Sequence, residues 1–193
     1  TSVTRDDLPD KGAGHFAETV KSVKEASRGT VMELLIPDLA GEKDLIEKVA
    51  FSGAEVIGHN IETPGALFAE TRPGADYQRS LTVLETLAGI RRGGARIKVK
   101  SSMILGLGET TEQVIETLRD LKRSGVDIVY LGQYLSPSSR HWPVRKYYTP
   151  EEFEALGGKA LRMGFSAALS GPMVRSSYRA RESYLKSAAN ACR

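Results

Sequence analysis

The sequence predicts an α/β protein whose strands run parallel and form a partial (β/α) barrel of the TIM type. Short, mostly apolar runs alternate with helical patterns along the chain, which is the order expected of strand–helix–strand units with right-handed crossovers. Five or six such units fit into 193 residues, whereas a closed eight-unit barrel takes about 250 residues. We therefore expect an open barrel in a single domain, residues 1–193, with a C-terminal extension at about residues 171–193.

Five strands are expected where apolar runs end at turn-forming residues, as buried parallel strands do. The expected strands are residues 31–36, 56–60, 97–105, 128–131 and 165–169. Residues 1–3 are a candidate for the cut end of a sixth strand.

Helices are expected between the strands, where apolar residues recur at three- and four-residue spacing. The helical stripes are Phe16, Val20 and Val23; Leu45, Ile46 and Val49; Tyr77, Leu81, Leu84 and Leu87; Val114, Ile115, Leu118 and Leu121; and Phe153, Leu156 and Ala160. Thr110 with Gln113 forms a capping box, and Thr149 followed by Pro150 and Glu152 is a second start signal. The glycines that mark the expected helix ends are Gly29, Gly53, Gly89, Gly125 and Gly164.

Composition narrows the class of protein further. The chain has 27 Lys and Arg against 24 Asp and Glu, a net charge of +3, which permits an acidic partner without requiring nucleic acid. The apolar runs are of strand length, so we expect no membrane-spanning segment. No signal peptide is visible, and we expect a cytoplasmic protein, or one of an organelle matrix if a targeting segment preceded Thr1. The single cysteine, Cys192, excludes an internal disulfide, a cysteine-only zinc site and a self-contained iron–sulfur site.

Polar residues gather where the second expected strand ends. Asn60 and Glu62 share one face of the strand by alternation, and His59 points the other way. An amide beside a carboxylate can bind a ribose diol or an amino group, while a role for Glu62 as an acidic cap of the next helix is equally open. We interpret His59 as a structural histidine rather than a metal ligand, because no second ligand stands at useful spacing.

The third expected strand holds two lysines in phase, Lys98 and Lys100, and ends in a Gly106–Leu107–Gly108 turn. A buried ammonium is costly without a partner. Glycines allow close approach of backbone to a ligand, and the helix that follows favours an anionic group. The pattern lacks the third glycine of a dinucleotide site, so it predicts only a small ligand with a carboxylate or phosphate.

The fourth strand leads into residues 133–143, which carry His141 and the single tryptophan, Trp142. We interpret this segment as a binding loop or lid, and simple packing of Trp142 is the alternative. Ser176 and Ser177 near the C-terminus have no His or Lys base beside them, so a hydrolase nucleophile is not expected. Serines there ordinarily cap a helix, which the pattern places at residues 181–185.

Six segments in this order resemble the lipoyl synthase family of radical S-adenosylmethionine enzymes. The segments are residues 5–10, 59–63, 72–77, 106–110, 132–135 and 175–178, which read RDDLPD, HNIET, RPGADY, GLGET, GQYL and RSSY. Each is weak alone, and together they cover nearly the whole chain.

The resemblance implies a partial radical-SAM barrel, with its first unit missing, that works with two [4Fe–4S] clusters and S-adenosylmethionine. It implies sulfur insertion at carbons 6 and 8 of an octanoyl-lysine on a lipoyl-carrier protein or domain. It implies Ser176 as an oxygen ligand of the auxiliary cluster, with Ser177 as second candidate, and assigns no catalytic residue. The implied cofactor-binding residues are Asn60, Glu62, Arg72, Tyr77, Lys100, Gly106, Gly108, Glu109 and Gln133.

Three departures from the family pattern bear on these expectations. The family's cluster cysteines lie upstream of the segment that Thr1 matches, and Cys192 corresponds to none of them. Because thiolates are the main ligands of such clusters, we expect no cluster on this chain alone, which corresponds to the C-terminal two-thirds of the family. A cysteine-bearing N-terminal segment or partner chain would supply the missing thiolate ligands. Lys11 and Ser102 stand where glycine is usual in the family.

Two alternatives to a sulfur-inserting enzyme stay open. One is a non-catalytic, degenerate barrel that binds a nucleoside or a carrier protein. The other is a barrel lyase that uses Lys98 or Lys100 as a base or Schiff-base former. No role with nucleic acid or a membrane is expected.

Overall fold

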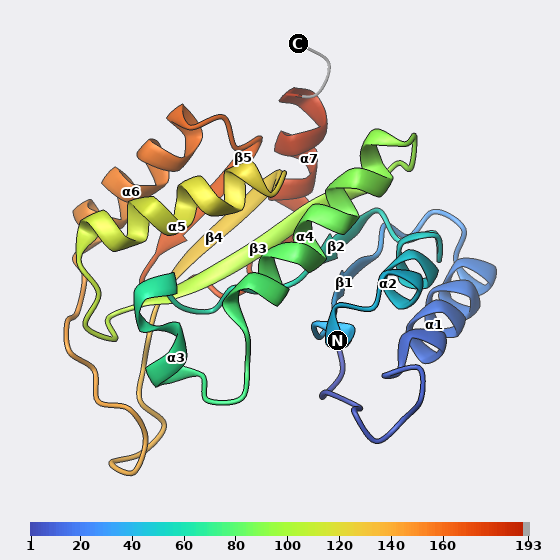
Figure 1. The fold of residues 1–193 in the computed structure, drawn as a ribbon. Helices are drawn as coiled ribbons and strands as arrows, with labels where there is room; N and C mark the ends of the chain where they lie inside the picture. Colours follow the sequence, from blue (N-terminus) through green and yellow to red (C-terminus); the bar gives the residue numbers. More distant parts are fainter. Residues whose placement is uncertain (191–193) are drawn as a thin grey trace.

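A computed structural model describes residues 1–190 and places five parallel strands in one open sheet of order β1-β2-β3-β4-β5 (Figure 1). The strands are β1 (Glu33–Leu35), β2 (Val56–Gly58), β3 (Lys98–Leu105), β4 (Ile128–Gln133) and β5 (Ala167–Gly171). The helices are α1 (Ala13–Ala26), α2 (Lys43–Ala50), α3 (Phe68–Thr71), α4 (Tyr77–Arg92), α5 (Thr111–Arg123), α6 (Pro150–Arg162) and α7 (Ala180–Asn190), with short 3-10 turns at Leu39–Gly41 and Gly65–Leu67. Sequential parallel pairing confirms the predicted open α/β barrel.

The five predicted strands are confirmed, but the candidate sixth strand is wrong. Residues 1–5 have no strand structure, and within residues 1–190 no strand pairs with β1 on its outer edge. A strand needs a partner for its backbone N–H and C=O groups. Residues 1–4 instead lie at the carboxyl end of the sheet, where Thr1, Ser2 and Thr4 line a cavity.

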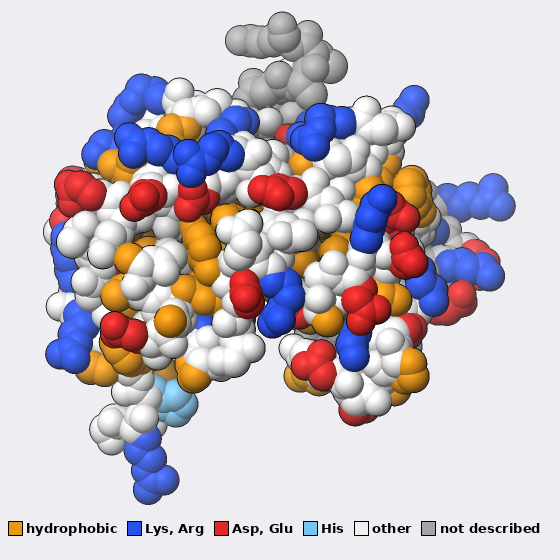
Figure 2. Space-filling model, in the orientation of Figure 1, with side chains coloured by type: hydrophobic (Ala, Val, Ile, Leu, Met, Phe, Trp, Pro, Cys, Tyr) orange, Lys and Arg blue, Asp and Glu red, His pale blue; other side chains and the backbone are white. Residues whose placement is uncertain are grey.

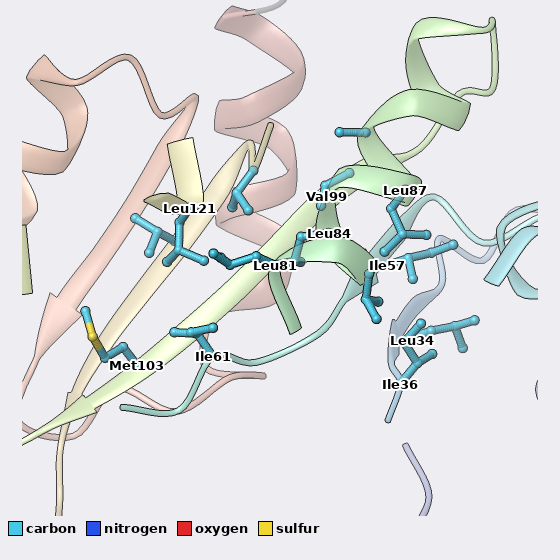
Figure 3. Close-up of a cluster of buried hydrophobic side chains, with 14 of the residues drawn as sticks. Leu34, Ile36, Ile57, Ile61, Leu81, Leu84, Leu87, Val99, Met103 and Leu121 are labelled. Carbon is cyan, nitrogen blue, oxygen red and sulfur yellow. The ribbon is translucent and has the colours of Figure 1, made fainter. Parts of the chain in front are cut away.

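The core lies between the sheet and the helices that cover its outer face. Alternate strand residues such as Leu34, Ile57 and Val99 point outward and are at most 4% exposed. Figure 3 shows them against the apolar stripe of α4, where Leu84 and Leu87 are fully buried. The alternation of side chains in the strands and the helical stripes of the sequence thus meet in one core.

The helix ends follow the predicted signals with one exception. Both start signals form complete capping boxes, in which the Thr110 and Thr149 hydroxyls accept a backbone N–H from Gln113 and Glu152. The expected stop at Gly89 is wrong, since α4 continues to Arg92. Glycine inside a helix costs only about 1 kcal/mol relative to alanine, and the burial of the preceding residues on the core outweighs it.

The C-terminal helix α7 lies on the inner side of the sheet, opposite α4, α5 and α6 (Figure 1). The hydroxyls of Tyr130 on β4 and Ser183 on α7 are hydrogen-bonded and buried. Helix α7 therefore covers the inner face near the amino ends of the strands. None of the helices within residues 1–190 has both the length and the apolar character needed to cross a membrane. Cys192 lies outside the described residues.

Candidate functional site

The carboxyl ends of β1 and β2 open into a cavity of about 560 Å³, called here the main cavity. Figure 2 shows this part of the surface as a notch in the lower edge. Segments far apart in the sequence build its walls, which is typical of the carboxyl end of a parallel sheet. The lining residues are Thr1, Ser2, Thr4, Asp6, Lys11, residues 35–38, Ala40, His59, Asn60, Glu62, residues 72–75, Arg79 and Ser80.

A smaller cavity of about 260 Å³, called the inner cavity, adjoins the main one over the inner face of the sheet. Asn60 and Glu62 line both cavities, and the Asn60 amide donates a hydrogen bond of 3.1 Å to the Glu62 carboxylate. The structure therefore brings this pair together just beyond the end of β2, where Glu62 has a φ of 66° in place of strand geometry. The rest of the inner cavity is Leu35, residues 102–104, Tyr130, Gly132 and residues 174–176.

Backbone strain is concentrated around the main cavity. Five non-glycine residues among the described ones have positive φ, and Lys11, Ala40 and Glu62 of these line the cavity. Leu39, next to Ala40, is a fourth. Strained backbone persists where the surrounding structure enforces it, and it is common at functional sites. The φ of 50° at Lys11 also gives a physical reason for the glycine that is usual there in the family.

His59 is buried at the wall of the main cavity. Its Nδ1 lies 3.0 Å from the carbonyl oxygen of Ile36, and its Nε2 has no hydrogen-bond partner within residues 1–190. Burial lowers the pKa of the imidazole, with Arg72 and Arg79 acting in the same direction and Asp38 opposing them. The ring is therefore neutral near pH 7 and donates Nδ1–H to Ile36. The Nδ1 atom thus makes a hydrogen bond of the kind expected for a structural histidine, whereas Nε2 makes none within residues 1–190.

The glycine turn after β3 does not leave its amides free for an anion. The Glu109 carboxylate accepts the backbone N–H groups of Gly106, Leu107 and Gly108 at 2.7, 2.9 and 3.1 Å. A Cβ on Gly106 would lie 2.5 Å from the carbonyl oxygen of Lys146. The close approach that the glycine allows in this structure is thus to the protein's own chain, and the anion site expected here stays a prediction.

Three more predicted cofactor residues also bond within the protein, and none lines the main or the inner cavity. Tyr77 donates to Asp120 of α5 at 2.8 Å, and burial raises the pKa of this phenol. Lys100 forms an ion pair of 2.6 Å with Glu33. Gln133 donates to the carbonyl oxygens of Tyr134 and Lys146 and accepts the N–H of Tyr148. The structure thus places Tyr77, Lys100 and Gln133 in contacts within the protein and outside both cavities, and their prediction as cofactor residues stays untested.

The remaining predicted residues converge on the cavities. Arg72 lines the main cavity, and the half-buried Ser176 lines the inner cavity together with Asn60 and Glu62. Neither Ser176 nor Ser177 forms a side-chain hydrogen bond within residues 1–190, and α7 begins only at Ala180. These serines therefore do not cap a helix in the described part of the structure.

The structure adds two residues that the sequence reading did not single out, Asp38 and Arg79. Their side chains form an ion pair of 2.6 Å in the wall of the main cavity, and Asp38 also accepts the N–H of Ala40. The position of Asp38 at the end of the first apolar run was a usable signal. No signal in the sequence pointed to Arg79, because its contact with Asp38 joins α4 to a turn 41 residues away.

The described residues fit a polar small molecule better than a metal ion. Within residues 1–190 no group of three or more His, Cys, Asp and Glu side chains could hold a metal. An iron–sulfur cluster therefore lacks its thiolates here. The main cavity, by contrast, offers amide, carboxylate and guanidinium groups over a volume of about 560 Å³, within the usual range for small-molecule sites.

Known proteins resemble the chain along almost its whole length. Lipoyl synthase of Alkaliphilus metalliredigens is 46% identical over 186 residues, 96% of this chain and 63% of the relative. Lipoyl synthase of Syntrophotalea carbinolica is 47% identical over 181 residues, 93% of this chain and 58% of the relative. Lipoyl synthase 1, mitochondrial, of Pisum sativum is 46% identical over 188 residues, which are 97% of this chain and 50% of the relative. The chain thus spans between half and two thirds of these relatives. No family model matches it.

Solved structures agree on the fold. Methylornithine synthase superimposes with a TM-score of 0.53 and 21% identity over 63% of this chain and 34% of that protein. A radical S-adenosylmethionine methyltransferase from Kitasatospora setae superimposes with a TM-score of 0.50 and 14% identity. The match covers 80% of this chain and 29% of that protein. At these identities the likeness concerns the architecture alone. Sequence identity near 46% across almost the whole chain is the decisive finding, and it makes the chain similar to a part of the lipoyl synthases.

Proposed function

We propose that this chain forms the S-adenosylmethionine-binding part of a lipoyl synthase, which inserts sulfur at carbons 6 and 8 of a protein-bound octanoyl-lysine. The observation that carries the proposal is the Asn60–Glu62 pair, which stands in the walls of two adjoining cavities at the carboxyl end of the sheet. The relatives named lipoyl synthase support the reaction.

The polar side chains of the main cavity suit a nucleoside cofactor. Asn60 can donate to and accept from a ribose hydroxyl, and the Glu62 carboxylate accepts from a hydroxyl or an amino group. Arg72, in the same wall, suits the carboxylate of an amino acid. S-Adenosylmethionine supplies the radical chemistry when bound. The residues of this chain hold and orient it and exclude water.

The clusters that the family implies need ligands from outside residues 1–190, because the described residues hold no suitable group. We propose that a cysteine-bearing segment or partner chain supplies them, and that an octanoylated lipoyl-carrier protein or domain is the substrate. Ser176, which shares the inner cavity with Asn60 and Glu62, is proposed as the oxygen ligand toward the auxiliary cluster. Oxygen is a harder ligand for iron than thiolate. We propose the cytoplasm or an organelle matrix as the compartment, and three of the relatives are named mitochondrial.

Binding of S-adenosylmethionine tests the assignment of the pair. In a cysteine-complete protein, Asn60→Ala and Glu62→Ala should each weaken binding by about 1–3 kcal/mol, the cost of a lost hydrogen bond to a charged or buried group. Isothermal titration calorimetry measures the affinity. Tyr77→Phe is the matched control, because it removes a hydroxyl bonded to Asp120 outside both cavities, and its affinity should equal that of the parent. Unchanged affinity in both alanine variants would remove the pair from the site.

Ser176→Ala in the cysteine-complete protein tests the oxygen ligand. We expect 5′-deoxyadenosine to form while lipoyl product is lost, with Ser177→Ala as the control, because Ser177 is exposed and lines neither cavity. Lipoyl product at the parent rate in Ser176→Ala would contradict the role.

A non-catalytic binding module is the second candidate, favoured by the absence of a metal-holding group within residues 1–190. Anaerobic reconstitution of the chain together with a cysteine-bearing segment distinguishes the two. Cluster absorbance and 5′-deoxyadenosine release would support the enzyme. Nucleoside binding without either would support the module.

A further inference from the structure

The segment between β4 and α6, residues 134–148, forms a projection that we call the arm. Figure 1 shows it extending beyond the carboxyl end of β4, at the lower left, and it contains no helix or strand. The proposed function assigns no role to the arm.

The arm is held in place by hydrogen bonds, although it has no regular structure. The Trp142 indole N–H donates to the carbonyl oxygen of Leu107 at 2.9 Å, and the Tyr134 hydroxyl donates to the Trp142 carbonyl at 2.8 Å. The backbone N–H of Arg145 donates to Gly106 at 2.8 Å. These contacts fix the arm to the glycine turn after β3, and the three hydrogen bonds of Gln133 fix both ends of the arm to the end of β4. A fixed loop presents its side chains without a large ordering cost on binding.

The arm is also one-sided in charge. It contains Arg140, Arg145 and Lys146 and no Asp or Glu. Lys146 pairs with Glu152 at 2.6 Å, while the exposed Arg140 and Arg145 form no ion pair within residues 1–190. Figure 2 shows basic and histidine side chains at the projecting end. Two exposed apolar side chains accompany them, Leu135 at 49% exposure and Tyr147 at 68%.

The arm stands beside the proposed site. Its Tyr134 and Trp142 line a cavity of about 300 Å³ together with Glu62 and Arg72, which also line the main cavity. Ile104 and Leu107 make part of this wall apolar. A molecule seated on the arm would thus lie next to an opening that reaches the residues of the proposed cofactor site.

We infer that the arm is the docking surface for the protein substrate, and that Arg140 and Arg145 bind carboxylates on an acidic surface of it. The inference rests on the proposed function for the presence of a protein substrate. Arginine and tyrosine are typical anchors of protein interfaces. Two unpaired arginines are too few for nucleic acid, whose binding commonly uses about 6–10 phosphate contacts. They are also fewer than the roughly 4–8 clustered cations that mark an anionic-membrane site.

Charge reversal on the arm tests the inference. The probe is an octanoylated lipoyl-carrier domain with a net negative charge, and its Kd for the chain is measured between low and physiological salt. Arg140→Glu with Arg145→Glu should weaken binding by at least ~10-fold and flatten its salt dependence, because unlike charges at the interface become like charges. The control is Arg92→Glu with Arg96→Glu, which makes the same change in net charge on exposed residues at the amino end of the sheet. Its Kd should stay within ~2-fold of the parent.

Equal Kd values for the arm variant and the parent, or equal loss in the control, would overturn the inference. So would failure of the parent chain to bind the carrier domain, or tighter binding of RNA or anionic vesicles through the same two arginines. S-Adenosylmethionine affinity of a cysteine-complete protein separates this result from the proposed function. The arm variant should keep that affinity, whereas Asn60→Ala and Glu62→Ala should lose it.

Discussion

The two faces of the sheet differ in how they are stabilised. On the outer face, side chains such as Val99 and Leu131 are fully buried among apolar residues of the helices. The same two strands carry Lys100 and Tyr130 on the inner face, where the Lys100 ammonium lies 3.8 Å from the centre of the Tyr130 ring. The outer face is held by non-directional apolar burial. The inner face depends on single polar partners, which makes its geometry specific.

The partners on the inner face come from distant parts of the chain. Glu33, which pairs with Lys100, is 67 residues away, and Ser183, which bonds Tyr130, is 53 residues away. Burial lowers the pKa of the Lys100 ammonium, and the ion pair with Glu33 opposes this effect. One strand thus combines an apolar face, which needs only burial, with a polar face whose partners depend on the whole fold.

The largest expected effect is on the outer face. Leu131→Ala should reduce the free energy of unfolding by about 2–5 kcal/mol, since it leaves a cavity in a packed core. Ser102→Ala, on the inner face, removes a hydroxyl without a hydrogen-bond partner within residues 1–190 and should change stability by no more than ~0.5 kcal/mol. Urea denaturation measures both, and a similar cost for the two variants would contradict the distinction between the faces.

The ion pair on the inner face should give the next largest effect. Glu33→Ala leaves Lys100 buried without its partner and should cost about 2–3 kcal/mol, less than the roughly 3–5 kcal/mol of a fully buried pair. The reduction is expected because the Glu33 side chain is 23% exposed. Replacing both members, Glu33→Leu with Lys100→Met, should restore most of the loss. A double variant less stable than Glu33→Ala would show that the pair contributes more than mutual charge compensation.

The smallest effect concerns His59 and depends on pH. Because burial lowers the pKa of folded His59 below 6.5, the unfolded chain takes up a proton below pH 6.5 that the folded chain does not. Stability should therefore fall as the pH drops from 6.5 toward the lower folded pKa, by at most about 1.4 kcal/mol per pH unit. His59→Gln should reduce this slope in denaturation curves at pH 7 and 5.5. An unchanged slope would assign the acid sensitivity to other groups.

The candidate site could be predicted only in part. Asn60 and Glu62 stand two residues apart after a strand, and their side chains are hydrogen-bonded, although the backbone at Glu62 is not extended. Glu109 and Gln133 look like ligand residues in the sequence, but their polar atoms bond to backbone of the glycine turn and of the arm. Nothing in the sequence distinguishes a carboxylate that binds a ligand from one that binds its own turn.

The order of the five strands and of the helices between them, both capping boxes, the apolar outer face and the resemblance to lipoyl synthases could all be predicted from the sequence. These features depend on residues close together in the chain, or on periodicity that repeats along each element. The packed fold brings Ser176 into the wall of the same cavity as Asn60 and Glu62, pairs Asp38 with Arg79, and places Glu33 against Lys100. Each of these arrangements joins segments whose distance depends on how the strands pair and where the loops return. Side-chain partners across a sheet are therefore properties of the packed fold and not of the local sequence.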